Sequence, residues 1–216
     1  MAGKSPHEVL RWALGAFPPD RIAIACSFGA EDVVIVHMAA QILPGVRVFY
    51  LDTDLLFPET YATRDRVAAR YPIRLEQVRP ALSLEEQARR YGDDLWARDP
   101  DLCCSLRKVE PLRGVLAGLW AWITGIRREQ SPTRAHAREV EWDKKFGLVK
   151  VNPLVRWTWE EVWGYIRGNE IPYNPLHDRN YPSIGCIHCT RPVKPGEHFR
   201  AGRWAGFQKT ECGLHE

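Results

Sequence analysis

Residues 21–32, RIAIACSFGAED, decide the fold class that the sequence predicts. Residues 21–26 form a short apolar run, which is typical of a buried parallel strand. A turn with Gly29 follows, and residues 33–43 are apolar over the length of a helix until Pro44-Gly45. A strand, a glycine-containing turn and a helix are the opening of a βαβ unit. The free N–H groups of such a helix N-terminus can bind a phosphate or a sulfate. This turn has neither a Walker loop nor a Gly-x-Gly-x-x-Gly pattern, so an ordinary tight turn remains an alternative.

The alternation of strands and helices continues along the chain. We expect strands over 46–51, 73–78, 120–125 and 148–155, and helices over 7–17, 58–71, 107–119 and 158–168, with a further helix that begins at Ser83. Alternation of this kind predicts a parallel sheet. From Asn169 onward proline and glycine recur and the periodicity fades, which predicts an irregular region. We therefore predict a single α/β domain over 1–192, with a mostly parallel twisted sheet and helices on both faces. A mobile C-terminal segment, 193–216, would follow it.

Four cysteines form two tight pairs, Cys103-Cys104 and Cys186-x-x-Cys189, which suggests one metal or cluster site. Structural zinc with four cysteines usually takes two Cys-x-x-Cys knuckles, and only the second pair has that spacing. Adjacent cysteines diverge, which suits a cluster that spreads its ligand directions over several irons. This favours a [4Fe-4S] cluster over zinc, while a disulfide pair remains the third interpretation.

Composition limits the classes of function. The chain has 216 residues, 45% of them hydrophobic, and a net charge of +3. That charge is too small to indicate a nucleic-acid partner by itself. No apolar run reaches the length of a membrane span, and the start of the sequence has no apolar signal core. We therefore expect a cytoplasmic protein, without membrane or nucleic-acid partners, whose six cysteines are ligands or catalysts rather than disulfides.

Two further stretches are chemically informative. The basic loop 126–134 follows a predicted strand and Gly125, so it could hold an anion, although a solvated loop is the alternative. Cys212 lies close to the C-terminus, where chains are usually mobile. A lone thiol there is either incidental or a nucleophile that must move.

With these residues in view, the sequence resembles the assimilatory sulfonucleotide reductases, and among them the thioredoxin-dependent adenylyl-sulfate (APS) reductases of bacteria. The shared motifs are Ser-Phe-Gly-Ala-Glu-Asp at 27–32, Leu-Asp-Thr at 51–53, Cys-Cys…Arg-Lys at 103–108, Thr-Gly-x-Arg-Arg-x-Gln-Ser-Pro at 124–132, Gly-Cys-x-x-Cys-Thr-Arg-Pro at 185–192 and Glu-Cys-Gly-Leu-His at 211–215. The resemblance extends from about Arg21 to the end of the chain.

This resemblance implies a PP-loop adenine-nucleotide-binding fold that reduces APS to sulfite and AMP in sulfate assimilation and cysteine biosynthesis. It implies that Cys212 attacks the sulfur of APS to form an S-sulfocysteine, and that thioredoxin then releases sulfite. The chain ends shortly after the Glu-Cys motif and does not continue into the thioredoxin-like domain of the plant enzymes, so we expect a separate thioredoxin. The sequence leaves a homo-oligomer open.

The resemblance also assigns roles to residues. The implied ligands of the [4Fe-4S] cluster are Cys103, Cys104, Cys186 and Cys189. The implied catalytic residues are Cys212, Lys108 and His215. The implied substrate-binding residues are Ser27, Phe28, Gly29, Leu51, Gly125, Arg134, Arg200 and Arg203. One departure lies in the first loop, where many APS reductases read Ser-Phe-Ser-Gly-Ala-Glu-Asp, so the nucleotide contacts of this loop stay open.

Three alternatives compete with this interpretation. A phosphoadenylyl-sulfate (PAPS) reductase needs cations for an extra 3′-phosphate, and family members of that kind generally lack the two cysteine pairs; an enzyme that uses both substrates is also open. A PP-loop thiolase that uses ATP and carries an iron–sulfur cluster would have a Ser-Gly-Gly-x-Asp loop, which is absent. A metal-stapled binding module without activity would need neither Cys212 nor a nucleotide.

Overall fold

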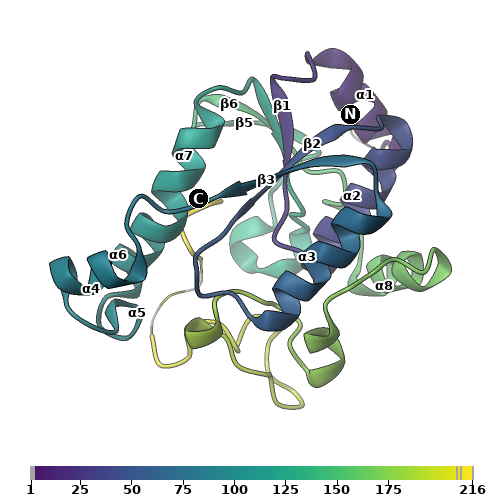
Figure 1. Cartoon of the computed structure of the whole chain (residues 1–216). Coiled ribbons are helices and arrows are strands. Elements are labelled where there is room, and N and C mark those ends of the chain that lie inside the picture. The colour runs from purple at the N-terminus through teal and green to yellow at the C-terminus, as the bar shows by residue number, and fades with distance from the viewer. Residues whose placement is uncertain (1–2, 208, 210, 216) are drawn as a thin grey trace.

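A mostly parallel sheet organises the fold (Figure 1). The computed structural model describes residues 3–207, 209 and 211–215. In this part of the chain six strands lie in the order β3-β2-β1-β4-β6-β5. The strands are β1 (Ile22–Ala25), β2 (Val46–Leu51), β3 (Ile73–Val78), β4 (Ala121–Ile123), β5 (Val140–Asp143) and β6 (Leu148–Val151). Neighbouring strands are parallel except β5, which pairs antiparallel with β6. The predicted fold class is confirmed, and β5 is an addition to it.

Helices cover both faces of the sheet (Figure 1). One face carries α1 (Pro6–Ala16), α2 (Ala30–Ile42), α3 (Pro58–Arg70) and α8 (Trp159–Gly168), and the other carries α7 (Glu110–Leu116). The strands alternate between two cores because successive side chains point to opposite faces. In β4, for example, Ile123 packs with the α2 side and Trp122 packs with the α7 side. Both faces of the sheet are therefore buried, as a parallel sheet requires.

The helix after β1 begins earlier than predicted. We expected it from Val33, whereas α2 starts at Ala30 and buries almost its whole circumference. Glu31 and Asp32 thus belong to its first turn, at 8% and 9% exposure. Two carboxyl groups are consequently buried beside the turn that follows β1.

The first cysteine pair lies within a helical stretch. This stretch starts at Pro100 in α6 (Pro100–Cys104), passes through a π-turn over Ser105–Val109 and continues into α7. Two short helices precede it, α4 (Leu84–Tyr91) and α5 (Leu95–Arg98). We predicted a helix only from residue 107, so the prediction missed the part that carries the cysteines. Pro100 occupies the first position of α6, where a proline needs no N–H partner.

After α8 the chain is irregular, as expected, apart from 3₁₀ turns at Pro175–Arg179 and Ile187–Cys189. The described residues near the C-terminus return to the side of the sheet that α7 covers (Figure 1). Leu214 packs against the core on the α7 side. Within the described ranges, no helix is both long enough and apolar enough to cross a membrane.

Candidate active site

The strand order creates a crevice between β1 and β4. From β1 the chain builds outward through β2 and β3, and then returns to add β4 on the other side of β1. Ligands of open α/β sheets bind at the carboxyl ends of the strands beside such a switch point. A cavity of about 210 Å³ lies there. The cavity is lined by every predicted catalytic and substrate-binding residue: Ser27, Phe28, Gly29, Leu51, Lys108, Gly125, Arg134, Arg200, Arg203, Cys212 and His215.

The turn between β1 and α2 forms one wall of this cavity. Phe28 has a φ of 60°, a left-handed conformation that is strained for a bulky side chain. Its buried ring packs edge-on against Tyr50, with 5.4 Å between the ring centroids. The backbone N–H and the hydroxyl of Ser27 both donate to Oδ2 of Asp32 at 2.6 Å. Asp32 therefore holds the turn from inside α2.

Gly125 follows β4 and forms the opposite wall. A Cβ atom at this position would overlap the Asp32 carboxylate and touch Cβ of Glu31. A glycine is needed here because the end of β4 passes directly over the first turn of α2. The predicted substrate-binding residues Ser27 and Gly125 thus both lie against Asp32, which the resemblance includes only as the last residue of the predicted nucleotide-binding loop 27–32.

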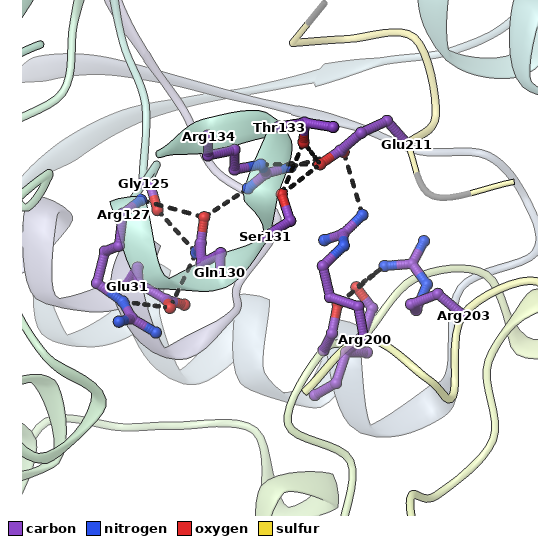
Figure 2. A network of polar contacts seen from close by, with 12 residues as sticks. Glu31, Gly125, Arg127, Gln130, Ser131, Thr133, Arg134, Arg200, Arg203 and Glu211 are labelled. Atoms are coloured by element: carbon purple, nitrogen blue, oxygen red, sulfur yellow. Dashed lines mark hydrogen bonds and ion pairs between the residues drawn. The ribbon is translucent and has the colours of Figure 1, made fainter. Parts of the chain in front are cut away.

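An anion cage lies beside these walls, made by Ser131, Thr133, Arg134 and Arg200 around the carboxylate of Glu211 (Figure 2). We call these four side chains the Glu211 cage. Arg134 donates from Nε to Oε1 at 3.0 Å and from Nη2 to Oε2 at 2.8 Å. Arg200 donates from Nη2 to Oε2 at 3.1 Å. Burial raises the pKa of Glu211, but the hydrogen bond from Arg134, the charges of Arg134 and Arg200, and the hydrogen bond from Ser131 together outweigh it and lower the pKa below its usual range.

A buried network behind the cage orients Arg134 (Figure 2). Arg127 donates from Nε to Oε1 of Glu31 at 2.9 Å, and both side chains are almost fully buried. Gln130 donates to the same oxygen at 3.0 Å and accepts from Nη1 of Arg134 at 2.5 Å. The chain of contacts runs from α2 to the C-terminal segment, so the fork of Arg134 is fixed from both ends. The sequence analysis considered Glu31, Arg127 and Gln130 only as members of the loops 27–32 and 126–134, and it assigned no role to Glu211, although all four lie in the quoted motifs.

The four predicted cluster cysteines approach one another from two segments. Burial raises the pKa of Cys103 to about 12, and the neighbouring Cys104, Cys186 and Cys189 add to the rise. The second segment is anchored to the end of β2: the Ile187 N–H donates to the Leu55 carbonyl at 2.8 Å, and the Thr53 hydroxyl lies 3.3 Å from Sγ of Cys186. All four thiols are free. Within the described ranges no three His, Cys, Asp or Glu side chains form a site for a single metal ion.

The side chain of Lys108 lies between the predicted cluster cysteines and the cavity. It is buried and lines the cavity together with Cys212. Burial lowers the pKa of Lys108, but the sulfur atoms of Cys186, Cys212 and Cys104 outweigh this and raise the pKa above its usual value. The ammonium group thus lies among three thiols, where its positive charge favours thiolates.

The C-terminal segment is docked on both sides of Cys212. Before it, Glu211 lies in its cage, and after it Lys145 donates from Nζ to the carbonyl of Gly213 at 2.6 Å. The ring of His215 stacks on Trp122 with centroids 5.4 Å apart. Burial lowers the pKa of His215 well below its usual value, so this imidazole is neutral. The half-buried thiol of Cys212 is presented to the cavity between these two anchors.

Fold and site together define an α/β protein whose switch-point cavity combines basic side chains with a free thiol. The family described as phosphoadenosine phosphosulfate reductase domain matches residues 21–192. The chain therefore belongs to this family, which confirms the resemblance found in the sequence.

Individual relatives and a solved structure agree with this family assignment. The chain is 52% identical to an adenosine 5′-phosphosulfate reductase of Staphylococcus epidermidis, over 98% of this chain and 87% of that protein. It is equally similar, at 52% identity, to the enzyme of the same name from Geobacillus kaustophilus, over 98% of this chain and 90% of that protein. A crystal structure of the PAPS reductase of Candida auris in a phosphate complex superposes with a TM-score of 0.75, at 35% identity, covering 88% of this chain and 91% of that one.

Proposed function

We propose that this protein reduces adenosine 5′-phosphosulfate to sulfite and AMP, with Cys212 as the nucleophile and thioredoxin as the electron donor. The observation that carries the proposal is the placement of the Cys212 thiol in one cavity with the β1–α2 turn, Arg200 and Arg203. The names of the relatives at 52% identity support APS as the substrate. The proposal assigns the protein to cytoplasmic sulfate assimilation and cysteine biosynthesis.

In the first step, the Cys212 thiolate attacks the sulfur of the bound phosphosulfate. A bond forms between Sγ and that sulfur while the bond from the sulfur to the bridging oxygen breaks, and AMP leaves with the electron pair. Negative charge accumulates on the leaving phosphate, where Arg134, Arg200 and Arg203 can neutralise it. The N-terminal turn of α2 would receive the nucleotide phosphate. The product on the protein is an S-sulfocysteine.

In the second step, a thioredoxin thiolate attacks Sγ of Cys212. Sulfite leaves, a mixed disulfide forms, and the second thioredoxin thiol then frees Cys212 and closes the thioredoxin disulfide. The thioredoxin dithiol supplies the two electrons that reduce the sulfur. This exchange requires the C-terminal segment to present Cys212 first to the cavity and then to a second protein.

The four cysteines of the two pairs have the donor atoms that an iron–sulfur cluster needs, because thiolates are the usual ligands of such clusters. Cys103, Cys104, Cys186 and Cys189 would hold a [4Fe-4S] cluster, which would supply negative charge and a covalent clip between two distant segments. Lys108 would lie between that charge and the substrate. Its ammonium group can attract the phosphosulfate and stabilise the thiolate of Cys212.

A PAPS reductase, or an enzyme for both substrates, is the second candidate. The solved structure of the Candida auris PAPS reductase, at 35% identity, supports it. The two cysteine pairs favour APS, since by resemblance PAPS reductases generally lack them.

Sulfite release from purified, anaerobically handled protein tests the proposal. APS and PAPS are compared side by side with thioredoxin and its reductase, and iron is measured in the same sample. We expect turnover of APS, about four irons per chain and no turnover by Cys212→Ser at unchanged iron. A preference for PAPS would support the second candidate. No turnover of either substrate at full iron content would instead support a binding module.

A further inference from the structure

We propose that Glu211 is the positioning residue that holds Cys212 in the cavity, and that Arg134 serves as its anchor. The inference deepens the proposed function and rests on it for the role of Cys212. Glu211 precedes Cys212 in the chain, is only 7% exposed and has two arginines on its carboxylate. A buried carboxylate with this many donors holds one geometry, because any displacement of the carboxylate breaks several charged contacts at once.

The contact is directional as well as charged. Arg134 meets both carboxylate oxygens of Glu211 with two different nitrogens, a bidentate arrangement that fixes orientation. The hydroxyls of Ser131 and Thr133 lie 3.2 and 3.3 Å from Oε1. Oε1 of Gln130 in turn accepts a hydrogen bond from Nη1 of Arg134. The Arg134 side chain therefore cannot rotate without breaking the buried network described above. The backbone that enters Cys212 is therefore attached, through Arg134 and Gln130, to the loop after β4 and to Glu31 of α2.

The other side of Cys212 is held by different means. Gly213 has a φ of 81°, a turn conformation that favours glycine, and its carbonyl accepts from Lys145. Leu214 and His215 pack on the core around Trp122. These contacts secure the end of the segment, whereas the direction of the Cys212 thiol also depends on where Glu211 is attached. Without the Glu211 carboxylate, the segment would be attached only through the contacts after Cys212, and the Cys212 thiol would no longer have a fixed orientation.

The arginines around Glu211 can also contribute to the binding of an anionic substrate. Arg134 and Arg200 both contact the carboxylate of Glu211 and both line the cavity, so their positive charges can also act on an oxyanion there. Removing the carboxylate would increase this positive charge. Loss of Glu211 should thus reduce the rate of the chemical step without weakening the binding of an anionic substrate.

The test uses the full chain with its cluster intact and compares Glu211→Gln with Glu197→Gln. Glu197 is a matched control because its carboxylate also forms a two-nitrogen pair with an arginine, Arg191, outside the cavity lining. The first readout is the rate at which iodoacetamide alkylates Cys212, followed by mass mapping of the peptide. The second is the division of the kinetic effect between kcat and KM for APS.

We expect Glu211→Gln to raise the alkylation rate of Cys212 and to lower kcat, each by about tenfold or more, which is the scale of one lost charged contact. KM for APS should stay within about threefold or decrease, and the iron content should not change. Glu211→Asp, which keeps the charge on a shorter side chain, should recover part of kcat. Glu197→Gln should match the wild type in every readout.

Unchanged alkylation of Cys212 in Glu211→Gln would overturn the inference, as would a raised KM at constant kcat. Alkylation needs no turnover, so it separates this inference from the proposed function. If the wild-type protein reduces neither APS nor PAPS, but Glu211→Gln still exposes Cys212, the proposed function fails and the positioning role of Glu211 stands.

Discussion

Lys108 is a buried ammonium group, and the thiols of Cys186, Cys212 and Cys104 favour its charge while Arg203 opposes it. We predict that Lys108→Ala lowers kcat/KM for APS by about 100-fold, the scale found when one preorganised charged donor is removed from a reacting centre. The fold should survive, because the helical stretch that carries Lys108 keeps its apolar contacts through Leu112 and Leu116. Steady-state kinetics and circular dichroism of the same preparation check both parts. Wild-type activity in the variant would show that Lys108 only fills space.

Asp32 is a second buried charge, and it makes stability depend on pH. Burial raises the pKa of Asp32 to about 6 in the folded protein, from 3.8 without the fold. The folded state then binds more protons than the unfolded state between these two values, so stability falls as pH rises from about 4 to about 6 and is constant above. The charges of Glu31 and Arg134 act on Asp32 in opposite directions and leave this net rise.

We predict that Asp32→Asn abolishes this loss. One amide oxygen can accept both Ser27 contacts that the carboxylate oxygen accepts now, and it carries no charge. The free energy of unfolding of the variant relative to the wild type should rise by about 1 to 3 kcal/mol between pH 4 and pH 6. Urea titrations of both proteins across this range measure the difference, which cancels the other titrating groups. A constant difference would mean that Asp32 ionises normally in the fold.

At the scale of elements, the crossing of β4 over the start of α2 decides the shape of the cavity. We predict that Gly125→Ala destabilises the fold by about 1 to 3 kcal/mol, as overpacked substitutions do, and weakens AMP binding. The new Cβ would push the Asp32 carboxylate away from Ser27 and open the β1–α2 turn. Thermal unfolding and calorimetric titration with AMP measure the two effects.

Gly164→Ala is the matched control for this substitution. Gly164 lies inside α8, and a Cβ there meets no atom within 4 Å. Since alanine favours a helix interior more than glycine does, this variant should be neutral or slightly more stable. Equal behaviour of the two variants would remove the special role of Gly125.

The elements that the sequence predicted well are those with a local signal. The strands over 46–51 and 73–78 have the predicted bounds: the first is a mostly apolar run after Pro44-Gly45, and the second mixes apolar and polar residues between Pro72 and Pro80. The strand β5 was missed because Val140–Asp143 is short and mixed in polarity, and gains its partner only through the hairpin with β6. The strand predicted over 148–155 ends at Val151, because the chain turns at Pro153, which has no N–H for a ladder.

The candidate site divides in the same way. Short motifs located most of the predicted residues that line the cavity, whereas Arg134, Arg200 and Arg203 lie outside the quoted motifs and were assigned by the resemblance alone. The motifs could not show that Glu211 is bound by Arg134, or that His215 stacks on Trp122, because these contacts join segments far apart in the chain. Periodicity carries no information on such pairs. The segment after residue 193 was predicted to be mobile, and its docked form in the structure leaves that expectation untested.

At the scale of the whole molecule, the two cysteine pairs join the helical stretch after α5 to the irregular region after α8. If they hold a cluster, they close a long loop, and a clip of this kind restricts the unfolded chain much as a disulfide does. We predict that Cys186→Ser loses iron and lowers Tm by roughly 5–10 °C, the shift expected for about 2 to 4 kcal/mol in a chain of this size.

The variant Cys212→Ser distinguishes the stabilising role of the cluster from the catalytic reaction. The Cys212 thiol belongs to the cavity and not to the predicted ligand set, so this variant should keep both iron and Tm while losing sulfite release. Iron assays, thermal unfolding and turnover are measured on the wild type and both variants under anaerobic conditions. An equal loss of iron in the two variants would place Cys212 among the ligands. If Cys186→Ser instead kept its full iron content, Cys186 would not be a ligand, and the prediction that the cysteine pairs stabilise the fold through iron would be wrong.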